Sequence, residues 1–321
     1  MATTALEDAV RSQPAALRRM LDVDLTPALN VLGDRSRLWL VGTGTSEHAA
    51  ELGALFLRDA GRQAFAVPSM VAAQWPPFAP DDGVIVLTHT GETAYALAVW
   101  EHARSSGLPV VPLTGTDAGL PGALMTVPHE RAETYTVSYT TALLLLARLA
   151  LALGRPRFTQ EDLEGVPDAV GHALEVPGIQ EIDPPLRLLV LAATGAAAIT
   201  VREGALKVRE AARALAEGFD AEYLLHGNAV PLGSSDHLVL VSPPDDRDGF
   251  LAALGRAAKG AGLRVTALRE TADLPPLLAQ LPLTARLQLL ALRFAELRGQ
   301  DPDKVIVGAW DDPVLWALGK P

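Results

Sequence analysis

The chain has 321 residues, of which 49% are hydrophobic and 20% charged, and its net charge is −11. This composition is typical of a folded globular protein long enough for two domains, and the acidic balance argues against a nucleic-acid surface. Because no cysteine is present, disulfides and thiolate metal sites are excluded. No apolar run reaches the roughly 18 residues that a membrane span needs, so we expect a cytoplasmic protein.

Short apolar runs alternate with helical patterns along the first half of the chain. Helices are predicted over Ser46–Gly61 and Glu92–Gly107, each ending in a glycine, and the apolar helix TTALLLLARLALALG closes this half. Strands are predicted at RLWLVGTG from Arg37, QAFAVPS from Gln63, VIVLTHT from Val84, PVVPLTG from Pro109 and ALMTVPH from Ala123.

The second half repeats this plan after a polar connector, RPRFTQEDLEGVPDAV, which includes a short helix. Its predicted strands are RLLVLAATG, HLVLVSPPDD and LRVTALRE, and its helices are REGALKVREAARALAEG (Arg202–Gly218) and DGFLAALGRAAKGAG. Such alternation predicts an α/β fold of two tandem, doubly wound αβα sandwich domains with parallel sheets. We therefore expect an N-terminal helical segment (residues 1–30), a first domain (31–155), a linker (156–180) and a second domain with a C-terminal tail (181–321).

Two hydroxyl-rich stretches follow predicted strands of the first half directly. One contains Gly44, Thr45 and Ser46, and the other runs from Thr88 to Thr93. Open parallel sheets bind ligands beyond the carboxyl ends of their strands, where helix N-termini and hydroxyls can surround a phosphate. The alternative is that these residues only cap helices, for which Ser and Thr are favoured.

Three motifs resemble those of a known family. GTGTSEHAA and THTGETAYAL resemble the two phosphate loops of the sugar isomerase (SIS) domain. EGALKVREAARALAEGFDAEYLLHGN, Glu203 to Asn228, resembles a helix and loop in the isomerase half of glucosamine-6-phosphate synthase and in related sugar-phosphate deaminases. The likeness spans about Arg37 to Lys304 and implies a double-SIS protein.

The resemblance implies how the substrate is held. HERAETYTVSYTTALL resembles "E-x-x-V-x-x-T-K-x-Y-T-T", with Glu133 where valine is usual and Val137 where lysine is usual. Gly44, Glu133, Thr134 and Tyr135 are the expected contacts to the sugar. The expected phosphate ligands are Thr45, Ser46, Thr88, His89, Thr90 and Thr93, with an ordinary polar loop residue as the alternative for His89.

The resemblance also implies catalytic residues in the second half. Lys207 and Glu210 are three residues apart, so they project from one face of a helix. Glu210 matches the family's proton-transferring base and His226 the group that opens the sugar ring, which the neighbouring subunit supplies in the synthase. A homodimer with its site near the subunit interface is implied. The alternatives are a solvated Lys–Glu pair and a loop histidine.

The C-terminal tail departs from the family pattern "N-P-D-x-P-R-x-L-x-K-V". QDPDKVIVGAW has Val305 and Ile306 in place of Pro-Arg, and Trp310 where the family lysine is expected, with Lys304 or Lys320 as possible substitutes. Two functions remain open: a hexose 6-phosphate isomerase or amino-sugar-phosphate deaminase, and a non-catalytic phosphosugar sensor. A nucleotide-dependent oxidoreductase is disfavoured because GTGTSEHAA lacks the last glycine of G-x-G-x-x-G. No metal, cofactor or nucleic acid is expected, and the sugar is not specified.

Overall fold

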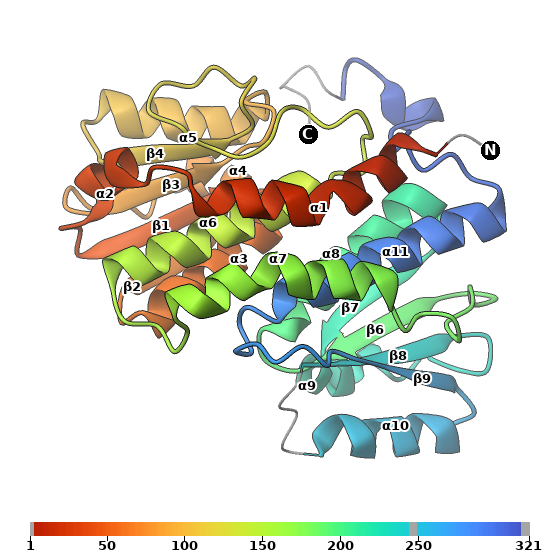
Figure 1. Cartoon of the computed structure of the whole chain (residues 1–321). Helices are drawn as coiled ribbons and strands as arrows, with labels where there is room; N and C mark the ends of the chain where they lie inside the picture. The colour runs from red at the N-terminus through yellow and green to blue at the C-terminus, as the bar shows by residue number, and fades with distance from the viewer. Residues whose placement is uncertain (1–2, 244–248, 316–321) are drawn as a thin grey trace. The chain divides into compact units, whose positions relative to one another are not determined.

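The computed structural model describes residues 3–243 and 249–315. It shows an α/β fold with two parallel sheets (Figure 1). The chain divides into two compact units, each of which combines separated segments: unit 1 contains residues 1–14, 132–136 and 165–305, and unit 2 contains residues 15–131, 137–164 and 306–321. The predicted tandem domains, residues 31–155 and 181–321, stay a prediction, because each unit contains residues from both the N-terminal and the C-terminal parts of the chain. Lys320 lies outside the described residues.

The sheet of unit 2 contains the strands predicted for the first half of the chain. Its order is β2-β1-β3-β4-β5, with parallel pairing throughout. The last strand is only two residues long, which is shorter than predicted. The strands are β1 (Arg37–Gly42), β2 (Gln63–Pro68), β3 (Gly83–Leu87), β4 (Val110–Thr114) and β5 (Leu124–Met125).

Helices cover both faces of this sheet because successive residues of its buried strands point to opposite sides. Val41 packs in a cluster with residues of α4 and α5, among them Ala72 and Trp100. On the other face, Leu40 lies against Gly53 of α3, beside Leu146 of α6. The helices of this unit are α2 (Thr26–Leu32), α3 (Thr45–Asp59), α4 (Ser69–Gln74), α5 (Ala94–Ser105) and α6 (Val137–Leu153), with the short η2 (Gly308–Asp311) in the tail. The division between the units passes through α1 (Ala5–Leu21) and α7 (Gln160–Glu175).

Unit 1 has a four-stranded parallel sheet of order β7-β6-β8-β9. Leu191 of β6 packs with Val208 of α8 and Leu287 of α11, whereas Leu240 of β8 packs with Leu254 of α10 on the opposite face (Figure 1). The elements are β6 (Leu189–Ala193), α8 (Ala197–Ala212), β7 (Ala216–Asp220), α9 (Ala221–Tyr223), the π-helical η1 (Leu224–Asn228), β8 (His237–Ser242), α10 (Phe250–Gly260), β9 (Arg264–Arg269) and α11 (Gln280–Arg298).

Two predicted elements of the second half differ in the structure. The helix expected through Gly218 ends at Ala212, because Arg213 takes a left-handed conformation with φ 47°, and the chain then enters β7. The connector holds a helix of 16 residues, α7, which continues through Pro167. A proline inside a helix removes one backbone hydrogen bond, and here the helix tolerates that loss.

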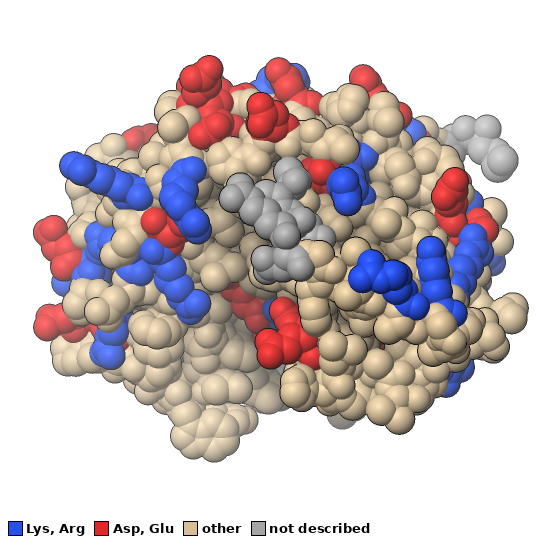
Figure 2. Space-filling model, turned by 90° about the horizontal axis from the view of Figure 1, so that it is seen from below, with Lys and Arg blue, Asp and Glu red and all other residues tan. Residues whose placement is uncertain are grey.

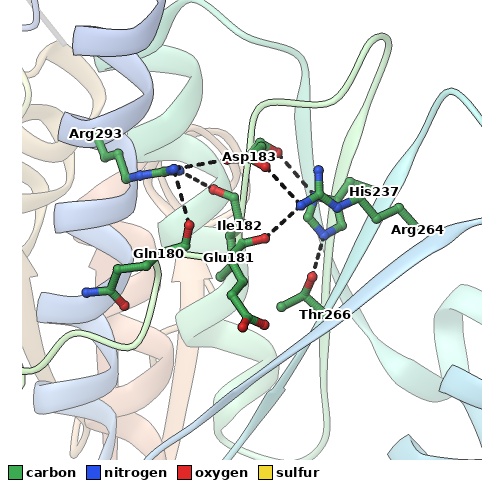
Figure 3. A network of polar contacts seen from close by, with 8 residues as sticks. All are labelled: Gln180, Glu181, Ile182, Asp183, His237, Arg264, Thr266 and Arg293. Carbon is green, nitrogen blue, oxygen red and sulfur yellow. Dashed lines mark hydrogen bonds and ion pairs between the residues drawn. The ribbon is translucent and has the colours of Figure 1, made fainter.

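A polar network joins the segment before β6 to β8, β9 and α11 (Figure 3). The Asp183 carboxylate accepts from Arg264 at 2.9 Å and from Arg293 at 3.0 Å. His237 is buried, with Nδ1 3.1 Å from the Asp183 carbonyl oxygen and Nε2 2.8 Å from the Thr266 hydroxyl. Because a carbonyl oxygen can only accept, Nδ1 carries the proton. Burial lowers the pKa of His237, so the ring is neutral in the folded protein.

The face drawn in Figure 2 carries acidic side chains among the basic ones. In the part of the chain that the structure describes, no helix combines the length and the apolar character required to cross a bilayer.

Candidate functional site

The two hydroxyl-rich loops follow neighbouring strands of unit 2. Strands β1 and β3 pair directly, with Val41 opposite Val86, and each leads into one loop and then a helix. From β1 the chain continues to β2 on one side of the sheet, and from β3 to β4 on the other. This is the switch point at which open α/β sheets bind ligands, and it brings the two loops together.

The loop after β1 depends on glycine. A Cβ on Gly42 would lie 2.4 Å from the backbone oxygen of Ser46, so only glycine allows the strand end to approach the helix this closely. Gly44 has φ 56° and stands at the N-cap of α3, where it provides no capping side chain. Thr45 and the half-buried Ser46 form the first turn of the helix, at the positive end of its dipole.

The loop after β3 places several hydroxyls close together. Thr88 is almost fully buried, and its Oγ1 donates to Oγ1 of Thr93 at 3.4 Å. Thr90 Oγ1 accepts from the backbone N–H of Glu92 at 3.1 Å. Although Thr93 is the N-cap residue of α5, its side chain makes no capping hydrogen bond. Helix capping therefore does not explain the hydroxyl at Thr93, and phosphate binding by these residues stays a prediction.

The His89 ring packs against residues outside its own loop, Gly115 after β4 and His129 after β5. Its plane lies 17° from that of His129, with the centroids 6.0 Å apart, and a Cβ on Gly115 would lie 2.8 Å from its Cε1. Burial lowers the pKa of His89, and the nearby His129 acts in the same direction, whereas Glu130 and Asp117 oppose it. Burial is the largest of these effects, so the ring is neutral.

A buried acid–base cluster lies on α8 in unit 1. Lys207 Nζ is 2.6 Å from Glu210 Oε2 and 3.4 Å from Glu203 Oε1. Lys207 and Glu203 are fully buried, and 19% of the Glu210 side chain is exposed. The predicted pair is thus formed, but it is not the solvated surface pair of the alternative interpretation. Glu203 was not predicted as part of it, although its i,i+4 spacing from Lys207 was a usable signal.

The environment of Glu210 suits proton transfer. Burial raises the pKa of Glu210, Lys207 opposes that rise, and Glu203 adds to it. A carboxylate with a raised pKa, partly open to solvent, can both accept and return a proton near neutral pH. Lys207 faces two carboxylates, so its ammonium holds Glu210 in place through the 2.6 Å hydrogen bond.

His226 lies in the π-helical stretch η1 of unit 1. Its backbone has φ −84° and ψ 53°, outside the helical region, and Gly227 follows with φ 104°. The His226 side chain is exposed. Among the described residues, no hydrogen bond or ion pair joins it to Lys207 or Glu210, and its part in ring opening stays a prediction.

Three of the predicted sugar contacts, Glu133, Thr134 and Tyr135, come later in the chain than the hydroxyl-rich loops. They lie in unit 1, in residues 132–136. Thr134 is fully buried and donates to the Pro302 carbonyl oxygen at 3.0 Å. Glu133 Oε2 accepts from the Val305 N–H at 2.7 Å, and Tyr135 is half-buried. Thr134 and Glu133 thus contact the start of the C-terminal tail, and a sugar contact by any of the three stays a prediction.

Glu130 holds the beginning of α6. Its buried carboxylate accepts from the backbone N–H groups of Val137 at 3.3 Å and Ser138 at 2.9 Å, which have no partner within the helix. Among the described residues, no group of three or more His, Asp or Glu side chains is placed to hold a metal ion.

Comparison with known proteins agrees with the motifs at these loops. The SIS domain family model matches residues 32–151, which include both hydroxyl-rich loops. We refer to the matched residues 32–151 as the SIS segment. The SIS segment ends within α6 and contains the whole sheet of unit 2.

A curated relative extends the likeness beyond the SIS segment. The isomerizing glutamine–fructose-6-phosphate aminotransferase of Thermococcus kodakarensis is 28% identical over 94% of this chain and 54% of its own length. The chain thus spans about half the length of this relative.

Solved structures share the fold of the whole chain. The C-terminal domain of glucosamine-fructose-6-phosphate aminotransferase from Francisella tularensis superposes with a TM-score of 0.83 at 19% identity, covering 94% of this chain and 99% of that one. Tagatose-6-phosphate ketose/aldose isomerase from Escherichia coli gives 0.77 at 21% identity, covering 96% and 97%. At these identities the likeness establishes the fold.

Proposed function

We propose that this chain is a phosphosugar isomerase that interconverts the aldose and ketose forms of a hexose 6-phosphate, with an amino-sugar phosphate as the preferred class. The observation that carries the proposal is the buried cluster on α8, where Lys207 holds Glu210, a carboxylate whose pKa is raised. The hydroxyl-rich loops of the SIS segment and the names of the relatives support the choice of a sugar phosphate as substrate.

The proposed reaction divides the work between two groups of residues. Ser46, Thr88, Thr90 and the helix N-termini bind the phosphate dianion through hydroxyl and backbone N–H donors. Glu210 removes the proton from one sugar carbon and returns it to the adjacent carbon, through an enediol. His226 exchanges a proton with the ring oxygen when the sugar opens.

Solvent deuterium exchange tests the role of Glu210. In D₂O, the wild type incorporates deuterium into fructose 6-phosphate, or into another member of a panel of glucosamine, galactosamine and mannose 6-phosphates. Glu210→Gln abolishes exchange and leaves binding largely intact, because the amide keeps the shape and loses the base. Glu296→Gln, an exposed position on α11, is the matched control and retains exchange. Exchange at the wild-type rate in Glu210→Gln would exclude Glu210 as the base.

Thermal protection tests the phosphate loops. Hexose 6-phosphate raises the melting temperature of the wild type, and the double variant Ser46→Ala with Thr90→Ala loses that rise. Ser105→Ala, which removes an exposed hydroxyl at the end of α5 in the same unit, keeps it. Equal protection of the double variant and the wild type would exclude the proposed phosphate site.

Subunit mixing tests whether the partner subunit supplies the ring-opening histidine, as the resemblance implies. If the protein is a homodimer of this kind, Glu210→Gln and His226→Asn homodimers are each inactive, and mixed subunits recover part of the activity. Failure of the mixture to recover activity, with dimers present by light scattering, would exclude a shared site.

A non-catalytic phosphosugar sensor is the second candidate. It is favoured by Trp310, which stands where the family pattern has lysine and whose side chain is 72% exposed. Ligand-induced stabilisation without deuterium exchange or ammonia release, across the whole sugar panel, would identify the chain as a sensor.

A further inference from the structure

Residues 302–305 form hydrogen bonds with two segments of unit 1, the start of α1 and residues 133–134. The Asp303 carboxylate accepts from the backbone N–H groups of Ala5 and Leu6, each at 2.8 Å, at the start of α1. The Asp303 carbonyl oxygen accepts from the Glu133 N–H at 3.0 Å. Together with the bond from Thr134 to Pro302, these contacts fix the segment up to residue 303.

The last of these contacts joins the Glu133 side chain to the tail. Its Oε2 accepts from the Val305 N–H at 2.7 Å, a short hydrogen bond to an ionised acceptor. After Val305 the chain leaves unit 1, because residues 306–321 belong to unit 2, which also contains the hydroxyl-rich loops. Glu133 therefore acts on the backbone at the point where the tail begins.

Two departures from the SIS motifs meet in this one bond. The family pattern has valine at the position of Glu133 and proline at the position of Val305. Proline has no N–H and fixes its own φ near −65°, so it sets the path of the chain without an acceptor. Valine at 305 frees an N–H and a backbone torsion, and glutamate at 133 provides the acceptor that restrains them. The two changes compensate each other.

We propose that Glu133 is a positioning residue, which anchors the C-terminal tail through the Val305 N–H and does not itself contact the sugar. The proposal rests on the proposed function, because the tail it positions belongs to the unit with the phosphate loops. The described part of that tail carries exposed apolar side chains, with Trp310 72% and Val314 78% exposed. The anchor fixes the point from which those side chains extend.

Hydrogen exchange tests the anchor without any ligand. Glu133→Val removes the acceptor, and amides of residues 305–308 then exchange about three- to tenfold faster, as expected for loss of one such hydrogen bond. Glu133→Gln keeps an uncharged acceptor and gives a smaller increase. Glu296→Gln, an exposed glutamate of the same unit, leaves these amides unchanged. Exchange within twofold of the wild type in Glu133→Val would overturn the anchor.

The double variant Glu133→Val with Val305→Pro restores the residue pair of the family motif. Proline then replaces the hydrogen bond, so exchange at residues 306–308 returns to within about twofold of the wild type. Exchange at residues 306–308 in the single variant Val305→Pro shows whether the backbone at this position adopts the torsion of proline without disruption. Faster exchange in the double variant than in either single variant would contradict the compensation.

Affinity for fructose 6-phosphate separates positioning from direct contact. Glu133→Val weakens binding, and the double variant regains wild-type affinity, because the tail is again fixed although the carboxylate is gone. Affinity that stays low after exchange is restored would make Glu133 a ligand of the sugar, and unchanged affinity in Glu133→Val would leave it a purely structural contact. Either result overturns the positioning role. If the wild type binds no hexose phosphate, the proposed function fails, while the exchange experiment still decides the anchor.

Discussion

Replacement of Lys207 by methionine should destabilise unit 1 strongly. Lys207 Nζ lies 2.6 Å from Glu210 Oε2 and 3.4 Å from Glu203 Oε1, and both Lys207 and Glu203 are fully buried. Methionine fills most of the same volume, but it leaves a buried carboxylate without its cation. Removing one partner of a buried pair costs about 3–5 kcal/mol, against at most about 1 kcal/mol for an exposed pair. For a unit of this size that corresponds to a fall in melting temperature of roughly 10 °C.

The pH dependence of that loss is a second test of the same reasoning. Burial already raises the pKa of Glu210 above that of the unfolded chain, and without the Lys207 ammonium, which opposes that rise, the pKa of Glu210 rises further. The penalty is then full at pH values above the folded pKa and shrinks as the pH falls toward the unfolded value of about 4.3. Guanidinium unfolding followed by circular dichroism at pH 8 and pH 5 should show the larger loss at pH 8.

Lys259→Met is the matched control for this measurement. Lys259 is an exposed lysine of the same unit, near the end of α10, so its replacement should change the free energy of unfolding by less than about 0.5 kcal/mol. A loss below about 1 kcal/mol in Lys207→Met, or the same loss at both pH values, would refute the buried cluster as described.

Two further predictions concern the loop after β1 and the network at β8. Gly42→Ala should lower the melting temperature and abolish protection by hexose phosphate, because its Cβ would lie 2.4 Å from the Ser46 backbone oxygen. The control Gly260→Ala should do neither, because a Cβ at Gly260 meets no atom within 4 Å. Wild-type melting and protection in Gly42→Ala would contradict the close approach of the strand end to the helix. Burial lowers the pKa of His237 below 6.5 in the folded protein. As the pH falls, His237 therefore binds a proton in the unfolded chain at a higher pH than in the folded one, and the free energy of unfolding should fall below about pH 6.5. His237→Gln should flatten that part of a urea-unfolding profile, and an unchanged slope would show that another group titrates there.

Much of the fold could be predicted from the sequence, because local patterns agreed with the final structure. The strands beginning at Arg37 and Val84 are short apolar runs followed by glycine-containing polar loops, and each is a strand in the structure. Strand β7 could not be predicted in this way. The helical pattern runs on through Arg213, and nothing in the residue type signals that an arginine would adopt the left-handed conformation that ends α8.

In the candidate site, too, contacts between residues close in sequence could be predicted, whereas contacts that depend on tertiary packing could not. Spacing placed Lys207 beside Glu210, since residues three apart on a helix are neighbours. Spacing could not show that Lys207 is fully buried, which depends on packing of α8 with α11 and the sheet. Likewise, the contact of Glu133 with Val305 joins residues 172 positions apart, so no local pattern contains it.

The interleaving of the two units constrains how the protein can be assembled during synthesis. Residues 15–164 include all the strands of the first sheet, so that sheet can form while the rest of the chain is still being translated. Helix α1 begins before that stretch, but its first N–H groups are held by Asp303, almost 300 residues later. The first turn of α1 can therefore be completed only after Asp303 has been synthesised, long after the residues that form the first sheet.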